Sequence, residues 1–115
     1  MATEIKTKED LTNFIKNDNK VVVLKLGAEW CAPCTAMKPA VIEFITETAD
    51  WAVWGDIDVD AMEEDYEDFQ EEYEVEGLPY FMIYKGGEKV GTYMGSKVGG
   101  NGDNGMKDKV NEFKP

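Results

Sequence analysis

The distribution of hydrophobic residues along the chain separates strands from helices. A continuous aliphatic run is typical of a strand buried on both faces, and the pair Gly86-Gly87 between two apolar segments favours a two-residue hairpin turn. The expected strands are 21–26, 52–58, 80–84 and 89–94, with a short one near Ile5.

Four other segments repeat apolar residues every three or four positions, as an amphipathic helix does. Thr7 resembles an N-cap, with Asp10 in place of the usual Glu or Gln of a capping box, and this first helix should end at 17–19. Pro39 should bend the second helix rather than end it. The apolar positions, interpreted as core packing, are Leu11, Phe14 and Ile15; Met37, Val41, Phe44 and Ile45; Met62, Tyr66, Phe69 and Tyr73; and Met106, Val110 and Phe113.

Length and composition predict one globular domain over residues 1–115. The chain has 115 residues, 43% of them hydrophobic, which is enough for a single core. No apolar run approaches the roughly 18 residues of a membrane span, and residues 1–20 lack the pattern of a signal peptide. We therefore expect a cytoplasmic protein that does not bind membranes, with a monomer as the default state.

Negative charge is concentrated in one segment. The net charge is −12, and the segment 56–76 holds 12 of the 24 acidic residues but no lysine. The chain contains neither arginine nor histidine, so it lacks the basic patch that nucleic-acid binding requires. The acidic segment is either a solvated helix face or a surface that selects basic partners.

The only two cysteines, Cys31 and Cys34, are separated by two residues, between a predicted strand and a predicted helix. A Cys-x-x-Cys pair in a βαβ pattern indicates redox chemistry, and the first turn of a helix favours a thiolate. Cys31 would be the more exposed nucleophile, and Cys34 would resolve the mixed disulfide. The alternatives are a buried pair without a catalytic role and half of a metal site. Zinc and iron–sulfur sites normally need four Cys or His ligands, so we expect no metal.

A calcium loop is a weaker interpretation of the acidic segment. Asp56, Asp58, Asp60 and Glu67 match ligand positions of the calcium-loop template, but Ala61 stands where the template requires glycine. The first two of these aspartates also belong to a predicted strand. We therefore expect no calcium site.

The sequence around the cysteines resembles the thioredoxin family. Residues 28–34, Ala-Glu-Trp-Cys-Ala-Pro-Cys, are similar to the family's active-site stretch, which usually has glycine at the position of Ala32. The other similarities are Pro39 (the helix-kinking proline), Gly77-Leu78-Pro79 (a cis-proline segment opposite the active site), 84–88 (the next hairpin turn) and Gly95 (the active-site rim). They follow the family order from about 21 to 95. The resemblance implies an α/β thioredoxin-like fold, with a mixed sheet of four to five strands flanked by four helices.

The resemblance also implies a function, that of a general protein disulfide reductase in cell redox homeostasis and electron transport. Its Cys31–Cys34 pair would cycle between dithiol and disulfide, without a bound cofactor. The implied partners are disulfide-containing proteins and a thioredoxin reductase, usually an NADPH-dependent flavoenzyme. The alternatives are a specialised electron donor to one target and an interaction subunit whose disulfide chemistry is incidental. The implied substrate-binding residues are Trp30, Ala32, Pro33, Leu78, Pro79 and Gly95.

Lys25 departs from the family pattern. It stands where thioredoxins commonly bury an acidic residue, and Asp56 aligns with their partner lysine. A lysine inside an otherwise apolar strand requires an ion partner or a path to water. We therefore expect Lys25 and Asp56 to pair beneath Cys34, and one of them to exchange a proton with that thiol. The alternative is that the Lys25 side chain extends to the surface and has no redox role.

Overall fold

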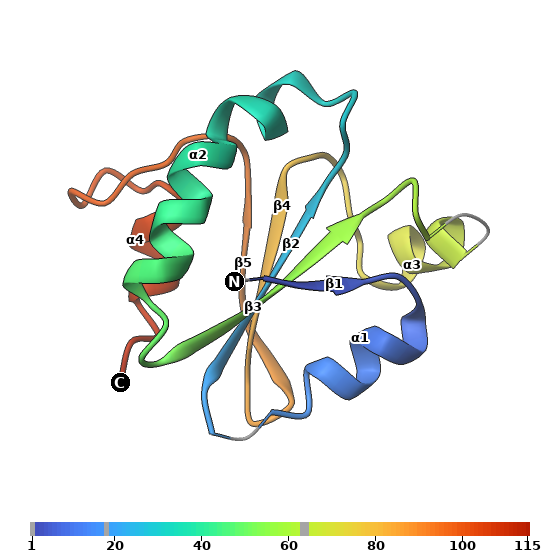
Figure 1. Cartoon of the computed structure of the whole chain (residues 1–115), viewed down its shortest axis with the longest axis horizontal. Helices are drawn as coiled ribbons and strands as arrows, with labels where there is room; N and C mark the ends of the chain where they lie inside the picture. The colour runs from blue at the N-terminus through green and yellow to red at the C-terminus, as the bar shows by residue number, and fades with distance from the viewer. Residues whose placement is uncertain (1, 18, 63–64) are drawn as a thin grey trace.

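The computed structural model describes residues 2–17, 19–62 and 65–115 (Figure 1). Within these residues the elements follow the order expected from the sequence. The strands are β1 (Thr3–Ile5), β2 (Val21–Gly27), β3 (Ala52–Asp58), β4 (Tyr80–Lys85) and β5 (Glu88–Met94). The helices are α1 (Lys8–Phe14), α2 (Ala32–Glu47), α3 (Asp65–Glu72) and α4 (Met106–Asn111).

The strands form one mixed five-stranded sheet with the order β1-β3-β2-β4-β5. β3 runs parallel to both β1 and β2, whereas β4 is antiparallel to β2 and to β5. The register of the central strands places Lys25 opposite Asp56 and Gly27 opposite Asp58. Every residue of β2 except Lys25 is buried, as expected for a strand that is covered on both faces. The fold is therefore the mixed α/β fold that the sequence predicted.

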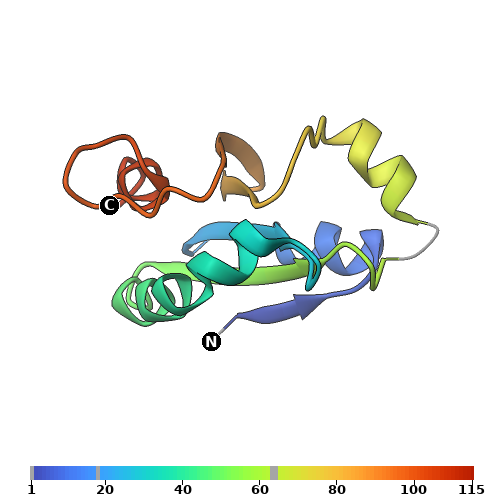
Figure 2. The same cartoon turned by 90° about the horizontal axis from the view of Figure 1, so that it is seen from above.

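Helices cover both faces of this sheet (Figure 1): α2 and α4 lie on one face, and α1 and α3 lie on the other. The view in Figure 2 shows β1 and the β4–β5 hairpin at opposite edges. Each face has its own apolar core. The α2/α4 side contains Met37, Val41, Phe44, Met106 and Val110, and the α1/α3 side contains Leu11 and Phe69. No helix in the described part of the chain is long and apolar enough to cross a membrane.

The predicted hairpin joins β4 and β5. Gly86 and Gly87 have φ values of 61° and 82°, and Lys85 pairs with Glu88 on either side of them. Two successive positive φ angles are the signature of a type I′ turn, whose twist matches that of the flanking strands. The two glycines supply a backbone conformation that other residues rarely adopt.

The first helix is shorter than the sequence predicted. Thr7 is the N-cap, and its Oγ1 accepts the backbone N–H of Asp10 at 3.0 Å. The helix ends at Phe14 instead of at 17–19. The Asn17 side chain accepts two backbone N–H groups of the following turn, at 3.0 and 3.1 Å. Asn17 therefore shapes the turn into β2 and does not terminate the helix.

The third predicted helix is also shorter. Met62 precedes α3 and Tyr73 follows it, yet Met62 and Phe69 are buried, and the tyrosines of the stripe pack against the same core. The stripe is therefore core packing, as predicted. Residues 63 and 64 of the acidic segment, like residue 18 at the predicted end of the first helix, lie outside the described residues.

Candidate active site

A disulfide joins Cys31 and Cys34 at the start of α2, with the two Cα atoms 5.3 Å apart. Cys31 is the N-cap residue: its backbone is extended, and its Sγ accepts the backbone N–H of Cys34 at 3.3 Å. Pro33 lies in the first turn, where the helix requires no N–H donor. The sequence Cys-Ala-Pro-Cys therefore places one sulfur directly at the positive end of the helix.

The two sulfurs lie below an exposed apolar surface. The exposed fractions are 6% for Cys31 and 4% for Cys34. Both residues are therefore buried, and Cys31, which was expected to be the more exposed, differs little from Cys34. In contrast, Trp30 is 68% exposed, and Ala32 and Pro33 are also exposed. These three residues therefore offer an exposed contact area beside the disulfide.

Asp60 holds the indole of Trp30. The Trp30 Nε1–H donates to Asp60 Oδ2 at 2.9 Å, and the Asp60 backbone N–H donates to Asp58 Oδ1 at 3.0 Å. The sequence analysis considered Asp60 only as a calcium ligand and missed this contact. A signal was present, because the ends of parallel neighbouring strands meet at one edge of a sheet and Asp60 follows β3 just as Trp30 follows β2.

The loop that contains Pro79 forms the opposite side of the site. The Leu78–Pro79 peptide bond is cis, as the resemblance implied, and the Pro79 carbonyl accepts the Gly95 N–H at 3.0 Å. Gly95 has a φ of 131°, a conformation that favours glycine. Among the described residues, neither the N–H nor the C=O of Leu78 has a backbone hydrogen-bond partner. An extended peptide can therefore pair with this residue.

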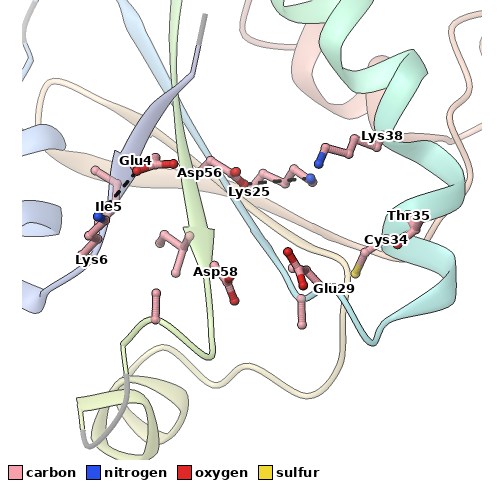
Figure 3. A pocket seen from close by; sticks show the side chains of 14 residues that line it. Glu4, Ile5, Lys6, Lys25, Glu29, Cys34, Thr35, Lys38, Asp56 and Asp58 are labelled. Carbon is pink, nitrogen blue, oxygen red and sulfur yellow. Dashed lines mark ion pairs between the residues drawn. The ribbon is translucent and has the colours of Figure 1, made fainter.

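A pocket of about 540 Å³ lies on the buried side of the disulfide (Figure 3). It lies between the first turns of α2 and the parallel strands, and both Cys34 and Lys25 contribute to its wall. Its lining residues include Gly27, and a Cβ atom there would lie 3.5 Å from Cys34 Sγ and 3.9 Å from Lys25 Cε. Gly27 thus leaves no side chain between the lysine and the sulfur.

Lys25 and Asp56 form an ion pair in this pocket. The Lys25 Nζ lies 3.9 Å from Asp56 Oδ1, and the exposed fractions of the two side chains are 13% and 46%. The pair is therefore half-buried. The Lys25 stem is buried in the sheet, and its ammonium group lies in the pocket. Its part in proton transfer stays a prediction.

The acidic residues of the calcium-loop pattern have other partners. Asp56 lies within β3 and pairs with Lys25, whereas Asp58 and Asp60 shape the turn beside Trp30. Over residues 2–17, 19–62 and 65–115, no group of three or more His, Cys, Asp or Glu side chains is arranged to hold a metal.

Comparison with known proteins agrees with this geometry. The family model described as Thioredoxin matches residues 2–110. The thioredoxin of Geodia cydonium is 30% identical over 115 residues, which cover 99% of this chain and 100% of that protein. Thioredoxin H2-2 of Oryza sativa subsp. japonica is 37% identical over 81 residues, which cover 70% of this chain but only 57% of that protein.

A solved structure supports the fold independently of close sequence similarity. The structure of Plasmodium falciparum thioredoxin superposes with a TM-score of 0.80, covering 97% of this chain and 99% of that one, at 22% identity. The cysteine pair at the start of α2 and the cis peptide bond at Pro79 lie where the sequence resemblance placed them. The chain belongs to the thioredoxin family of thiol–disulfide oxidoreductases.

Proposed function

We propose that this protein is a general protein disulfide reductase in which Cys31 is the nucleophile and Cys34 the resolving thiol. The observation that carries the proposal is the position of Cys31, whose sulfur caps α2 and accepts the Cys34 N–H at 3.3 Å. In the reduced protein, the same N–H group and the helix dipole stabilise a thiolate at this sulfur. Cys31 is therefore activated without a histidine or a metal.

The reaction consists of two thiol–disulfide exchanges. The Cys31 thiolate attacks a target disulfide, forming a mixed disulfide and releasing one target sulfur as a thiolate. Cys34 then loses its proton and attacks Cys31 Sγ, which breaks the mixed disulfide and releases the second target sulfur. The products are a target dithiol and the Cys31–Cys34 disulfide.

The exposed surface around the disulfide supplies the substrate-binding residues of this proposal. Trp30, Ala32 and Pro33 provide an apolar contact area, and the unpaired backbone of Leu78 offers strand-like hydrogen bonds beside Pro79. Gly95 adjoins this loop through the hydrogen bond from its N–H to the Pro79 carbonyl. Backbone pairing depends little on the target sequence, which suits a reductase with many targets.

The proton that leaves Cys34 requires an acceptor, and the Lys25–Asp56 pair is the candidate. Both residues line the pocket beneath the sulfur. Either the Asp56 carboxylate or a neutral Lys25 amine would take the proton, directly or through water. This assignment gives the charges behind the active site a catalytic role.

The recycling step and the cellular setting are part of the same proposal. An NADPH-dependent flavoenzyme would reduce the Cys31–Cys34 disulfide, and the protein would act as a monomer in the cytoplasm, in electron transport to target proteins. The family assignment supports a reductase partner in general terms. Oxidising and isomerising relatives carry a histidine between the two cysteines, whereas this chain has Ala32 and Pro33 there. This difference supports a reductant instead of an oxidant.

A specialised donor is the second candidate function, and the acidic helix favours it. The first turn of α3 alone contains Asp65, Glu67 and Asp68, and its last turn has no basic residue. Such a surface would select basic targets through complementary charge. Reduction rates compared across a basic and an acidic disulfide substrate separate the two functions, because only a specialised donor strongly prefers the basic one.

The test of the proposed function is an equilibrium redox titration of the Cys31–Cys34 pair together with an insulin reduction assay. A potential below about −240 mV and insulin turnover would support a reductase, since thioredoxin lies near −270 mV. A potential above about −200 mV would instead indicate an oxidant or isomerase. Without a reversible couple the catalytic proposal fails, and an interaction subunit becomes the better explanation. Cys31→Ser is the inactive control.

A further inference from the structure

Two lysine side chains, Lys25 and Lys38, line the pocket behind the disulfide together with Cys34. Lys25 comes from β2, and Lys38 comes from α2, one helical turn after Cys34. Figure 3 shows the two lysine side chains pointing toward each other from the strand and the helix. Among the described residues, the charged groups that line the pocket are Glu4 from β1, Lys6 directly after β1, Lys25 from β2, Glu29 from the loop before α2, Lys38 from α2, and Asp56 and Asp58 from β3.

Lys25 differs from the other charges because its side chain is largely buried. Its exposed fraction is 13%, whereas Glu29, Lys38 and Asp58 are exposed to solvent that screens their charges. Its ion pair with Asp56 is long, at 3.9 Å, and that carboxylate is 46% exposed. The positive charge of Lys25 is therefore only partly compensated, and it acts through a poorly screened environment.

The position of Gly27 directs this charge toward the resolving sulfur. A Cβ atom added to Gly27 would lie within 4 Å of both Lys25 Cε and Cys34 Sγ. The lysine stem and the sulfur thus face the same small space, with no other side chain of β2 between them. A positive charge on a side chain that borders this space stabilises a thiolate at Cys34 more than it stabilises the thiol.

We infer that Lys25 is a positioning residue that acts as a permanent cation, stabilising the Cys34 thiolate and making the Cys31–Cys34 pair easier to reduce. This inference rests on the proposed reductase function and decides between its two assignments for Lys25: the ammonium stabilises charge, and it does not take the proton of Cys34. The proton then passes to Asp56 or to water in the pocket.

The charge acts in both directions of the exchange. When a thiolate of the recycling partner attacks Cys31 Sγ, a new S–S bond forms and the Cys31–Cys34 bond breaks, leaving the electron pair on Cys34 as a thiolate. Lys25 stabilises that leaving group. In the opposite direction, a larger fraction of Cys34 is ionised and ready to attack the mixed disulfide, because its proton leaves more easily.

The test compares four variants of the otherwise intact protein. Lys25→Met removes the charge, and Lys25→Arg keeps a cation that does not deprotonate in the relevant pH range. Asp56→Asn removes the compensating carboxylate. Lys38→Met is the matched control, because it removes the same charge from an exposed side chain of the same pocket. Far-UV circular dichroism and denaturant unfolding confirm that each variant folds.

Two measurements report the effect. The first is the pH midpoint of Cys34 alkylation, measured with each change combined with Cys31→Ser, and the second is the redox equilibrium constant with glutathione at pH 7 and pH 9. We expect Lys25→Met to raise the midpoint by about one pH unit, a tenfold loss of thiolate, and to shift the equilibrium toward the disulfide. Lys25→Arg should retain both values. Asp56→Asn should lower the midpoint. Lys38→Met should shift the midpoint by less than about half a pH unit and change the redox equilibrium constant by less than about threefold.

Three results would overturn the inference. Lys25→Met could leave the midpoint unchanged or lower it, or Lys25→Arg could behave like Lys25→Met, which would identify a neutral amine that accepts the proton. An effect of Lys38→Met as large as that of Lys25→Met would show that net charge alone matters. If Lys25→Met does not fold, Lys25→Arg and Asp56→Asn still test the inference. A wild-type protein without a reversible couple contradicts the proposed function instead, so the two failures are distinguishable.

Discussion

The double role of Cys31, as helix cap and as nucleophile, predicts that stability and activity separate in two substitutions. Cys31→Ser keeps a hydrogen-bond acceptor at the N-cap of α2, whereas Cys31→Ala removes it. The group at stake is the Cys34 N–H, which donates to Cys31 Sγ at 3.3 Å in a buried position. Loss of an N-cap acceptor costs about 1 kcal/mol, within a range of roughly 0.5–2 kcal/mol.

The comparison is made between reduced proteins, because neither variant can form the disulfide. We expect reduced Cys31→Ala to unfold about 1 kcal/mol more easily than reduced Cys31→Ser, equivalent to a melting temperature lower by about 4 °C. Serine is among the best N-cap residues, so Cys31→Ser should be at least as stable as the reduced wild type.

The assay is guanidinium unfolding in excess reductant, followed by far-UV circular dichroism, with insulin reduction measured on the same samples. Both variants should lack turnover, since neither has the nucleophile. Equal stabilities of the two variants, with equal denaturant slopes, would refute the capping role of Cys31. Insulin turnover by Cys31→Ser would refute its role as nucleophile.

Three further predictions concern buried polar and titratable groups. Thr48→Val should cost about 1–3 kcal/mol in denaturant unfolding, since the buried Trp54 Nε1–H loses its acceptor at 2.9 Å, whereas Thr48→Ser should cost little. Hydrogen bonds from the N–H groups of Gly100, Gly105 and Gly102 hold the pKa of Asp108 well below its ordinary range. Its contribution to stability is therefore present above about pH 4 and is lost as pH falls toward the folded-state pKa, so an acid titration of Asp108→Asn should show a smaller loss than the wild type. Burial raises the pKa of Tyr84 above its ordinary value of 10.0, so stability should fall as pH rises above about 10, and Tyr84→Phe should reduce that fall in alkaline unfolding experiments.

The strands were predictable because burial on both faces leaves a continuous apolar run. The segment 52–58 coincides with β3, and 21–26 falls one residue short of β2, whose last residue is Gly27. The hairpin was predictable from two glycines alone, since few other residues adopt the φ values that a type I′ turn requires. These features depend on local chemistry and on burial, both of which the sequence records directly.

The ends of the helices and the partners of polar side chains were less accessible to sequence reasoning. The α1 helix ends a turn earlier than predicted, because asparagine can bond to the backbone of a turn as well as follow a helix end. The contact between Trp30 and Asp60 joins residues that are 30 positions apart, and it depends on how two strands leave the sheet. The order of the two parallel strands indicates that these residues lie near each other, but no local sequence pattern specifies the hydrogen bond between them.

The Lys25–Asp56 pair shows why a resemblance between sequences does not fix the electrostatics of a site. The two residues are directly opposite on neighbouring parallel strands, so exchanging an acid and a base between them preserves the net charge and the ion pair. The exchange does not preserve the charge that Cys34 experiences, because β2 and β3 are not equivalent with respect to α2.

That asymmetry follows from the order of the strands. The Lys25 stem shares the space beside Gly27 with Cys34 Sγ, whereas Asp56 lies one strand further out, between β2 and β1, and is 46% exposed. A carboxylate at the inner position would oppose a thiolate at Cys34, and the lysine found there favours one. Two proteins with the same fold and the same cysteine spacing can therefore differ in how easily their disulfides are reduced, with the sign of the difference set by which strand carries the lysine.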